Sequence, residues 1–357
     1  MKNKFPLHLS LIKDISEREI FNLMENFSSF SDINNVEIPF LSKTLGIRDR
    51  TINMIRRREV DKESIDRLEK LNVKIITYKD RDYPKRLLNY EPFPPIIFAR
   101  GDISILENKS IAMVGSRQCS YYGKEIAEKF GKALSNMGIV VVSGMALGID
   151  RYSHEGALKS SGKTVAVLGT GIDVIYPASN RNIYKEIIEN GCVISEFPPG
   201  TGPFKQNFPF RNRIIAALSN GVLVVESAYK SGTFKTVKWA LDYGIDVFAI
   251  PGDINRITSQ GTDLLIKEGA IPVISPNDII EYLGIPLEKS TKETSNKNEE
   301  LKDDLKIIYN KIKSMPVHFD ELLEETGLSI SELSSIAIQL EMKELIKKLP
   351  GNYFRRI

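Results

Sequence analysis

The sequence has little cysteine, little histidine and little net charge, and each scarcity excludes a class of function. Two cysteines, Cys119 and Cys192, lack the spacing of a metal site, and only three histidines are available for acid–base chemistry. The formal net charge of +3 is too small to indicate nucleic-acid binding, so any positive field must be local. No apolar run approaches the roughly 20 residues of a membrane span, and the first residues lack a signal-peptide pattern. We therefore expect a cytoplasmic protein that binds no metal and no membrane.

Two nucleotide-binding motifs are also absent. A dinucleotide-binding domain carries G-x-G-x-x-G after its first strand and an acidic residue further on for the ribose. Here the first strand is followed by the nine residues from Gly115 to Gly123, which contain neither feature. The tripeptide Gly162-Lys163-Thr164 imitates the end of a P-loop, but Ala157 occupies the position of its first glycine and a strand follows instead of preceding it. We expect neither NAD nor ATP as a cofactor.

Composition divides the 357 residues into four regions. Residues 1–80 are predicted to be a small helical domain, with helices over 16–27, 38–45 and 63–70. Residues 81–285 alternate apolar strands with helices. Residues 286–302 are too polar to bury a core and are predicted to be a linker. Residues 303–357 are predicted to be a winged helix, with three helices followed by a hairpin: 305–312, 319–325, 331–341, 345–349 and 353–356.

The central region is predicted to be α/β, an extended Rossmann-like, doubly wound parallel sheet. Its strands are Val/Ile-rich and too apolar to face water, which is typical of parallel strands covered on both faces. The predicted strands are 111–114, 140–142, 164–168, 193–195, 222–225 and 247–250. The predicted helices between them include 123–137, 180–189 and 234–242.

Small and polar residues follow several of these strands, at the edge of an open α/β sheet where ligands bind. The turn Gly115-Ser116-Arg117 follows the first strand, and Ser143-Gly144 follows the second. Positive residues fall along the same predicted edge: Arg117, Lys205, Arg211, Arg213, Lys230, Lys235 and Lys238. Phe204, Phe208 and Phe210 lie among them. Rings that stack unpaired bases, beside cations that follow the backbone, indicate single-stranded nucleic acid.

Four ionisable residues at this edge admit two interpretations. Asp150 and His154 are one helical turn apart, so they could serve as acid and base, or as a hydrogen-bonded pair that fixes the start of a helix. Glu196 and Glu226 follow strands, where a hydrolase would place its carboxylates. Each is equally placed to cap a helix or to hold a basic neighbour, so neither establishes catalysis.

An ordered set of segments resembles one family. The segments are Ile111 to Arg117, Ser143 to Asp150 with His154, Ser195-Glu196, Phe208 to Ile215, Ser231 to Thr233, and Pro251-Gly252 with Ser259 and Gly261. Each motif is weak alone, but their order is specific to the DNA-processing protein A (DprA/Smf) family. The resemblance implies sequence-independent binding and protection of single-stranded DNA, delivery to the RecA recombinase in natural transformation, and dimerisation. It implies no catalytic turnover.

The resemblance also implies roles for particular residues. Arg117 matches the arginine of the family's phosphate-binding loop. The residues that match its pocket rim are Ser116, Ser143, Gly144, Arg211, Asn212, Ser231 and Gly232. Lys205 and Phe208 lie in the loop where a basic and an aromatic contact are expected. The chain departs from the family pattern at Lys235, which places a charge in the first turn of a helix, where it contacts phosphate or faces water.

Two further features qualify the resemblance. The predicted recognition helix of the winged helix carries glutamates and serines and no basic residue before Lys343, so we expect this module to bind protein or to touch DNA only through Arg355 and Arg356. Related Rossmann-like proteins hydrolyse nucleoside monophosphates with a glutamate after a glycine-rich loop. Here the corresponding loop, Ser231 to Thr236, contains no carboxylate. A hydrolase and a nucleotide sensor remain the alternatives.

Overall fold

The computed structural model describes residues 4–12, 14–57, 62–160, 162–285, 303–312, 316–343 and 345–356. The chain divides into two compact units, residues 1–288 and 289–357. The predicted linker at 286–302 lies outside the described residues. Within the described parts, every helix is too short or too polar to cross a membrane.

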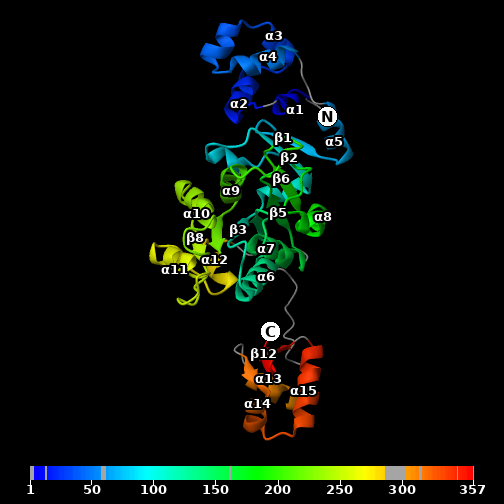
Figure 1. Cartoon of the computed structure of the whole chain (residues 1–357), viewed down its shortest axis with the longest axis vertical. Helices are drawn as coiled ribbons and strands as arrows, with labels where there is room; N and C mark the ends of the chain where they lie inside the picture. Colours follow the sequence, from blue (N-terminus) through cyan, green and yellow to red (C-terminus); the bar gives the residue numbers. More distant parts are fainter. Residues whose placement is uncertain are drawn as a thin grey trace. The chain divides into compact units, whose positions relative to one another are not determined.

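A nine-stranded, mostly parallel sheet forms the centre of the first unit, in the order β1-β2-β6-β5-β4-β3-β7-β8-β9 (Figure 1). The strands from β6 to β9 in this order run parallel, whereas β1 and β2 pair antiparallel with each other, and β2 pairs antiparallel with β6. The strand bounds are β1 Lys74–Thr77, β2 Ile96–Gly101, β3 Ser110–Val114, β4 Val140–Ser143, β5 Thr164–Val167, β6 Cys192–Ser195, β7 Gly221–Val224, β8 Val247–Ala249 and β9 Ile271–Pro272.

Helices cover both faces of this sheet, which confirms the predicted fold class. Their bounds are α6 Tyr121–Asn136, α7 Ile149–Leu158, α8 Arg181–Asn190, α9 Asn207–Ala217, α10 Thr233–Asp242, α11 Gln260–Lys267 and α12 Pro276–Tyr282. Short helical turns lie at η2 Lys85–Asn89, η3 Ile103–Glu107 and η4 Ala178–Asn180. Successive side chains of a strand point to opposite faces, so each buried strand contributes to two cores.

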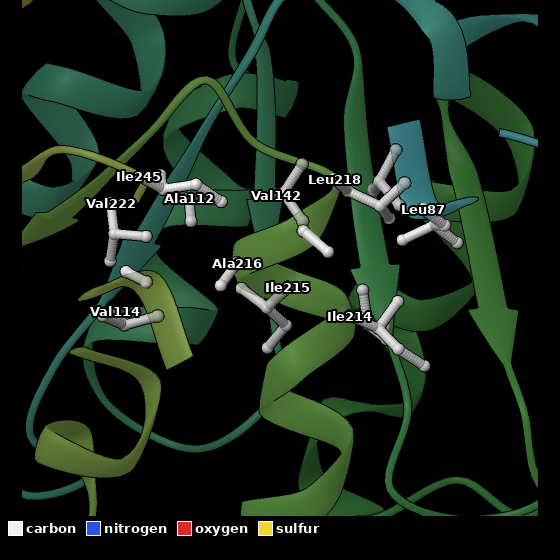
Figure 2. Close-up of a cluster of buried hydrophobic side chains, with 14 of the residues drawn as sticks. Leu87, Ala112, Val114, Val142, Ile214, Ile215, Ala216, Leu218, Val222 and Ile245 are labelled. Carbon is white, nitrogen blue, oxygen red and sulfur yellow. The ribbon is translucent and has the colours of Figure 1, made fainter. Parts of the chain in front are cut away.

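The core on one face is built around α9 (Figure 2). Ala112 and Val114 of β3 face Ile215 and Ala216 of this helix. The alternate residues of β3, Ile111 and Met113, belong to the opposite core, which also contains Phe130 of α6. The continuous apolar runs in the sequence are therefore explained by burial on both sides.

The helices before residue 80 form part of the same compact unit. Their bounds are α1 Lys4–Ser10, α2 Glu17–Asn26, α3 Phe30–Asn34, the π-helical turn η1 Phe40–Thr44, α4 Asp49–Arg57 and α5 Lys62–Lys70. Ser16 begins α2 with a capping box to Glu19, and burial of Leu23 and Ile33 forms the small core. Strand β1 was not expected, because the sequence indicates only helices there. The domain boundary at residue 80 stays a prediction.

The second unit has the order of elements predicted for a winged helix. It contains α13 Asp303–Lys311, β10 Val317–His318, α14 Phe319–Thr326, α15 Ile330–Met342, β11 Ile346–Leu349 and β12 Tyr353–Arg356. Gly327 ends α14 with a φ of +67°, a left-handed conformation that glycine adopts without strain. The short strand β10 is an addition to the prediction, and it pairs with β12.

Candidate nucleic-acid interface

The turn after β3 is tied to the loops after β4 and β7. The Ser116 N–H donates to the main-chain oxygen of Glu226 at 2.8 Å, and the Ile149 N–H donates to the oxygen of Ser116 at 3.1 Å. Glycine is required at position 115, because a Cβ there would lie 2.6 Å from Ile149 Cγ1 and 2.7 Å from the Glu226 oxygen. Three loops at the carboxyl ends of neighbouring strands are thus held together, as the sequence predicts.

Glu226 fixes the floor beneath this turn. Its side chain is buried, and its Oε2 accepts from the Ser120 N–H at 2.7 Å, at the N-cap of α6. A carboxylate at a helix N-terminus is stabilised by the helix dipole. The other carboxylate oxygen, Oε1, is buried and accepts no hydrogen bond from the described residues. Of the two structural roles expected for this residue, the structure places it in the capping one.

Arg117 and Phe208 come together at the exposed edge. The Arg117 guanidinium carbon lies 5.7 Å from the centroid of the Phe208 ring, within cation–π range. The ring packs on Gly169 after β5, where an added Cβ would lie 2.7 Å from Phe208 Cδ1. Tyr176 lies beside it with ring centroids 5.6 Å apart and is 46% exposed. A positive charge and two partly accessible rings therefore share one surface.

Sequence reasoning did not identify Tyr176 or Asn180. Tyr176 stands in the segment after β5 that leads to the same edge, so its position after a buried strand was the available signal. Asn180 lies behind this segment, and its Nδ2 donates to the main-chain oxygens of Met145 at 2.8 Å and Ala146 at 3.3 Å. It fixes the loop after β4. Nothing local in the sequence indicates that long-range contact.

Arg211 lies beneath the rim and not on it. Its side chain is buried, and its Nη1 donates to the main-chain oxygen of Gly144 at 3.0 Å and to that of Val167. Burial lowers the pKa of Arg211 to about 10, and the carboxylate of Asp150 opposes that shift. A direct phosphate contact would require this guanidinium to leave two carbonyls that join the ends of β4 and β5. The predicted contact of Arg211 with DNA remains a prediction.

The neighbours of Arg211 are buried to different degrees. Asn212 is half-buried, and its Oδ1 accepts from Arg211 Nε at 3.2 Å. Ser143 is fully buried, and its hydroxyl donates to the Met113 oxygen at 2.6 Å. The Gly144 main chain is held by Arg211. The rim residues predicted here therefore meet in space, but Ser143 and Gly144 support the surface from below.

Asp150 and His154 are both buried and make separate contacts. His154 Nδ1 lies 2.7 Å from Thr164 Oγ1, which itself donates to the Val141 oxygen. Thr164 therefore accepts from His154, and burial lowers the pKa of His154 to about 3. Burial also raises the pKa of Asp150, with Arg211 opposing the shift, and Asp150 accepts from the Ala146 N–H at 3.4 Å. The structure, which describes both side chains, shows no hydrogen bond between Asp150 and His154. His154 bonds to Thr164 of β5 instead, and Asp150 accepts from the loop after β4.

The remaining predicted residues lie at the start of helices. Ser231 accepts from the Thr233 N–H at 3.3 Å and its hydroxyl contacts that of Ser227 at 2.7 Å. Gly232 is the N-cap of α10; it contributes no side-chain hydrogen bond itself and has open space where a Cβ would lie. Lys205 is exposed before α9, and Lys235 is exposed in the first turn of α10. The start of α10 is an accessible, positively polarised helix end.

Arg213 belongs to a buried ion cluster next to this edge. It bonds to Glu196 at 2.5 Å and to Glu17 of α2 at 2.9 Å, and its guanidinium lies 3.8 Å from the Phe210 ring centroid. Burial alone would lower the pKa of Arg213, but the two carboxylates raise it. Glu196 thus holds a basic neighbour, the second of its two structural alternatives.

Among the described residues, no group of His, Cys, Asp and Glu could hold a metal ion.

Comparison with known proteins assigns both units. A family model described as DNA recombination-mediator protein A matches residues 74–284, and a DprA winged helix domain matches residues 292–352. Protein Smf of Escherichia coli K12 is 35% identical over 81% of this chain and 79% of its own length. DNA processing protein DprA of Streptococcus pneumoniae R6 is 44% identical over 56% of this chain and 71% of its own length.

Solved structures agree with this assignment. The X-ray structure of DNA processing protein A from Streptococcus pneumoniae has a TM-score of 0.67 and 34% identity, and covers 77% of this chain and 96% of that one. A structure of DNA processing protein A from Helicobacter pylori, described for its single-stranded DNA binding mode, has a TM-score of 0.54 and 30% identity over 59% of this chain and 95% of that one. Because one family model spans more than half of its residues and a 35% identical relative covers most of its length, this chain belongs to the DNA recombination-mediator protein A (DprA/Smf) family.

Proposed function

We propose that this protein binds single-stranded DNA without sequence preference at the carboxyl edge of its sheet. The observation that carries the proposal is the pairing of Arg117 with the Phe208 ring at 5.7 Å on an accessible surface. A guanidinium follows phosphates and a ring stacks any base, since every base has a π-face. Neither group reads the hydrogen-bonding edge of a base, so binding is sequence-tolerant.

In this proposal the strand lies along two anchors. One is the turn Gly115–Arg117, and the other is the start of α10 at Gly232, where the helix dipole favours an anion. Lys205 neutralises an adjacent phosphate, and Lys235 adds a charge at the helix start. Arg211 contributes its positive charge from beneath the surface while it holds the rim.

We further propose that the bound strand is protected and delivered to the RecA recombinase during natural transformation, in the cytoplasm. Membership of the family supports this step, as do the names of the relatives: one is a DNA processing protein, and another is described for binding single-stranded DNA. A homodimer would join two short grooves and raise affinity through effective concentration. Faster assembly of RecA filaments on strands loaded with this protein would test the delivery step, and sedimentation would test the dimer.

The winged helix is proposed to bind protein, separately from the DNA-binding region at 81–285. The solvent face of α15 carries Ile338, 57% exposed, and Met342, 81% exposed, with exposed glutamates beside them. Apolar and acidic groups suit a protein partner better than a phosphate backbone. Arg356 of the wing donates to the Tyr309 oxygen at 2.5 Å and stacks on that ring, so it is engaged within the module.

Fluorescence anisotropy with labelled single-stranded and duplex oligonucleotides across a salt series tests the proposal. Tight, salt-sensitive binding that prefers the single strand and tolerates any sequence is expected. Equal binding to both forms, or none, would reject it.

Hydrolysis of a nucleoside monophosphate is the alternative use of this edge. The side chains of Asp150, Glu196 and Glu226 are all buried. Asp150 and Glu226 accept from main-chain N–H groups of nearby loops, and Glu196 is paired with Arg213. A catalytic carboxylate must reach the reacting bond, whereas these three are bonded within the protein. Incubation with each nucleoside monophosphate, followed by chromatography for a released base, distinguishes the two functions.

A further inference from the structure

A cavity of about 1120 Å³ lies beside the proposed DNA edge. Its walls come from α2 and the residues before it, from the segment that leads into β2, from the segment after β6, and from the start of α9. All of these belong to the first compact unit. The cavity is therefore built jointly by the N-terminal helices and the sheet region.

Aromatic side chains form part of the walls of this cavity. Phe21 of α2 packs edge-on against Phe93, with ring centroids 5.7 Å apart. Phe204 projects into solvent with 55% of its surface exposed, and Phe210 lies over the Arg213 guanidinium. Aromatic faces of this kind are the surfaces on which unpaired bases stack.

Arg213 partly neutralises the carboxyl groups on the floor of the cavity. It lies between Glu196 and Glu17 and bonds to both. Burial and a hydrogen bond to Glu196 raise the pKa of Glu17, while Arg213 lowers the pKa of Glu196. The guanidinium therefore offsets part of the negative charge that a polyanion would meet here.

The exposed charged residues at the cavity have both signs. Asp14, which is paired with Arg50 at 3.1 Å, and the exposed Glu91 lie at the cavity and would repel a phosphate inside it. Arg18 is exposed on the α2 side, and Lys205 is exposed next to Phe204 on the other. A strand crossing here would keep its phosphates at these two cations and turn its bases inward.

The first turn of α9 connects this cavity to the DNA edge. Asn207 and Phe210 line the cavity, whereas Phe208 of the same turn meets Arg117 at the sheet edge. We propose that the cavity is a second segment of the single-strand site: the strand continues past Phe208, places an unstacked base against Phe204, and contacts Arg18 with a phosphate. This inference rests on the proposed function, and it assigns DNA contacts to the N-terminal helices.

The test compares Phe204→Ala and Arg18→Ala in the full-length protein, with oligothymidylates of about 6 and about 20 nucleotides. With the long strand, Phe204→Ala is expected to weaken binding about fivefold or more, and Arg18→Ala to reduce the salt slope by about 0.7. The short strand, which fills only the sheet edge, should bind both variants as it binds the unaltered protein. Arg81→Ala, at an exposed arginine in the turn after β1, is the matched control and should change neither strand.

Cross-linking locates the contact directly. A set of oligonucleotides carries 5-iodouracil at one position each. Nucleotide positions at one end should cross-link to peptides near Arg117, and positions further along the oligonucleotide should cross-link to the peptides that contain Phe204 and Phe21. Unchanged long-strand affinity in both variants, with cross-links confined to the sheet edge, would overturn the second segment and leave the proposed function standing. If the unaltered protein bound neither strand, both proposals would fail.

Discussion

Replacement of Arg117 by alanine is expected to remove one phosphate contact from the binding edge and to leave the fold intact. The side chain is exposed, and its guanidinium carbon lies 5.7 Å from the centroid of the Phe208 ring. The turn that carries it is held by main-chain bonds of Ser116 to the loops after β4 and β7, which the substitution does not touch.

The expected loss of affinity is that of one charged contact to one phosphate. A charge-assisted contact contributes about 1.5 kcal/mol, so affinity at low salt should fall about tenfold. One lost phosphate contact lowers the salt slope by about 0.7 for a single strand. Between about 50 and 200 mM salt, the fold-loss in affinity should therefore be about 2.6 times smaller for the variant than for the unaltered protein.

The assay is fluorescence anisotropy of a labelled single strand at several salt concentrations, with Arg81→Ala as the control for a general loss of positive charge. The loss should be the same for unrelated sequences, because a phosphate contact carries no sequence information. A variant that binds more weakly but keeps the original slope would refute the phosphate contact. A loss confined to one sequence would refute sequence-independent recognition by this residue.

Three further substitutions separate roles within the same edge. Arg211→Lys keeps the charge but cannot hold Gly144 and Val167 in the same way, so we expect weaker binding with an unchanged salt slope; an affinity equal to that of the unaltered protein would show that the bonds to these two carbonyls do not matter for binding. Gly169→Ala should displace the Phe208 ring and weaken binding by about as much as Phe208→Ala, roughly fivefold or more; an affinity equal to that of the unaltered protein would show that the ring position is unimportant. Burial lowers the pKa of His154 to about 3 from its ordinary 6.5, so its contribution to stability is complete above about pH 6.5 and falls as the pH drops toward 3. pH 5 lies about 1.5 units below the ordinary pKa, so the free energy of unfolding should fall by about 2 kcal/mol more between pH 8 and pH 5 in the unaltered protein than in His154→Gln. Denaturant unfolding at the two pH values measures this difference. An equal fall in both proteins would contradict the buried neutral imidazole.

The sequence predicts the buried strands well and the surface chemistry less well. Six predicted strands are confirmed within one residue at each end, because a parallel strand covered on both faces is a continuous apolar run. Strands β1, β2 and β9 were not among the predicted strands, and β9 has only two residues, too few for a periodic pattern. The start of α9 has Pro209 and two phenylalanines, which imitate a loop although proline is compatible with a first helical turn.

Charge in a sequence does not reveal burial. Arg211 and Arg117 look equivalent in the sequence as basic residues along the predicted edge, but Arg211 is enclosed by carbonyls at the ends of two strands and Arg117 faces solvent. The carbonyls belong to residues 44 and 67 positions away in the chain, so only the folded sheet brings them together. The aromatic neighbour Tyr176 was missed for the same reason, since its proximity to Phe208 depends on the order of strands in the sheet.

Strand β1 determines how the chain can be shortened. It lies at the outer edge of the nine-stranded sheet and pairs with β2 over four residues, from Lys74 opposite Ala99 to Thr77 opposite Ile96. A fragment beginning at residue 81 would lose this cover and present the apolar strand β2 as an unpaired edge, which is a template for aggregation. A fragment that carries the proposed DNA-binding region alone should therefore begin before Lys74, so that the sheet keeps its terminal strand and the fragment stays monodisperse.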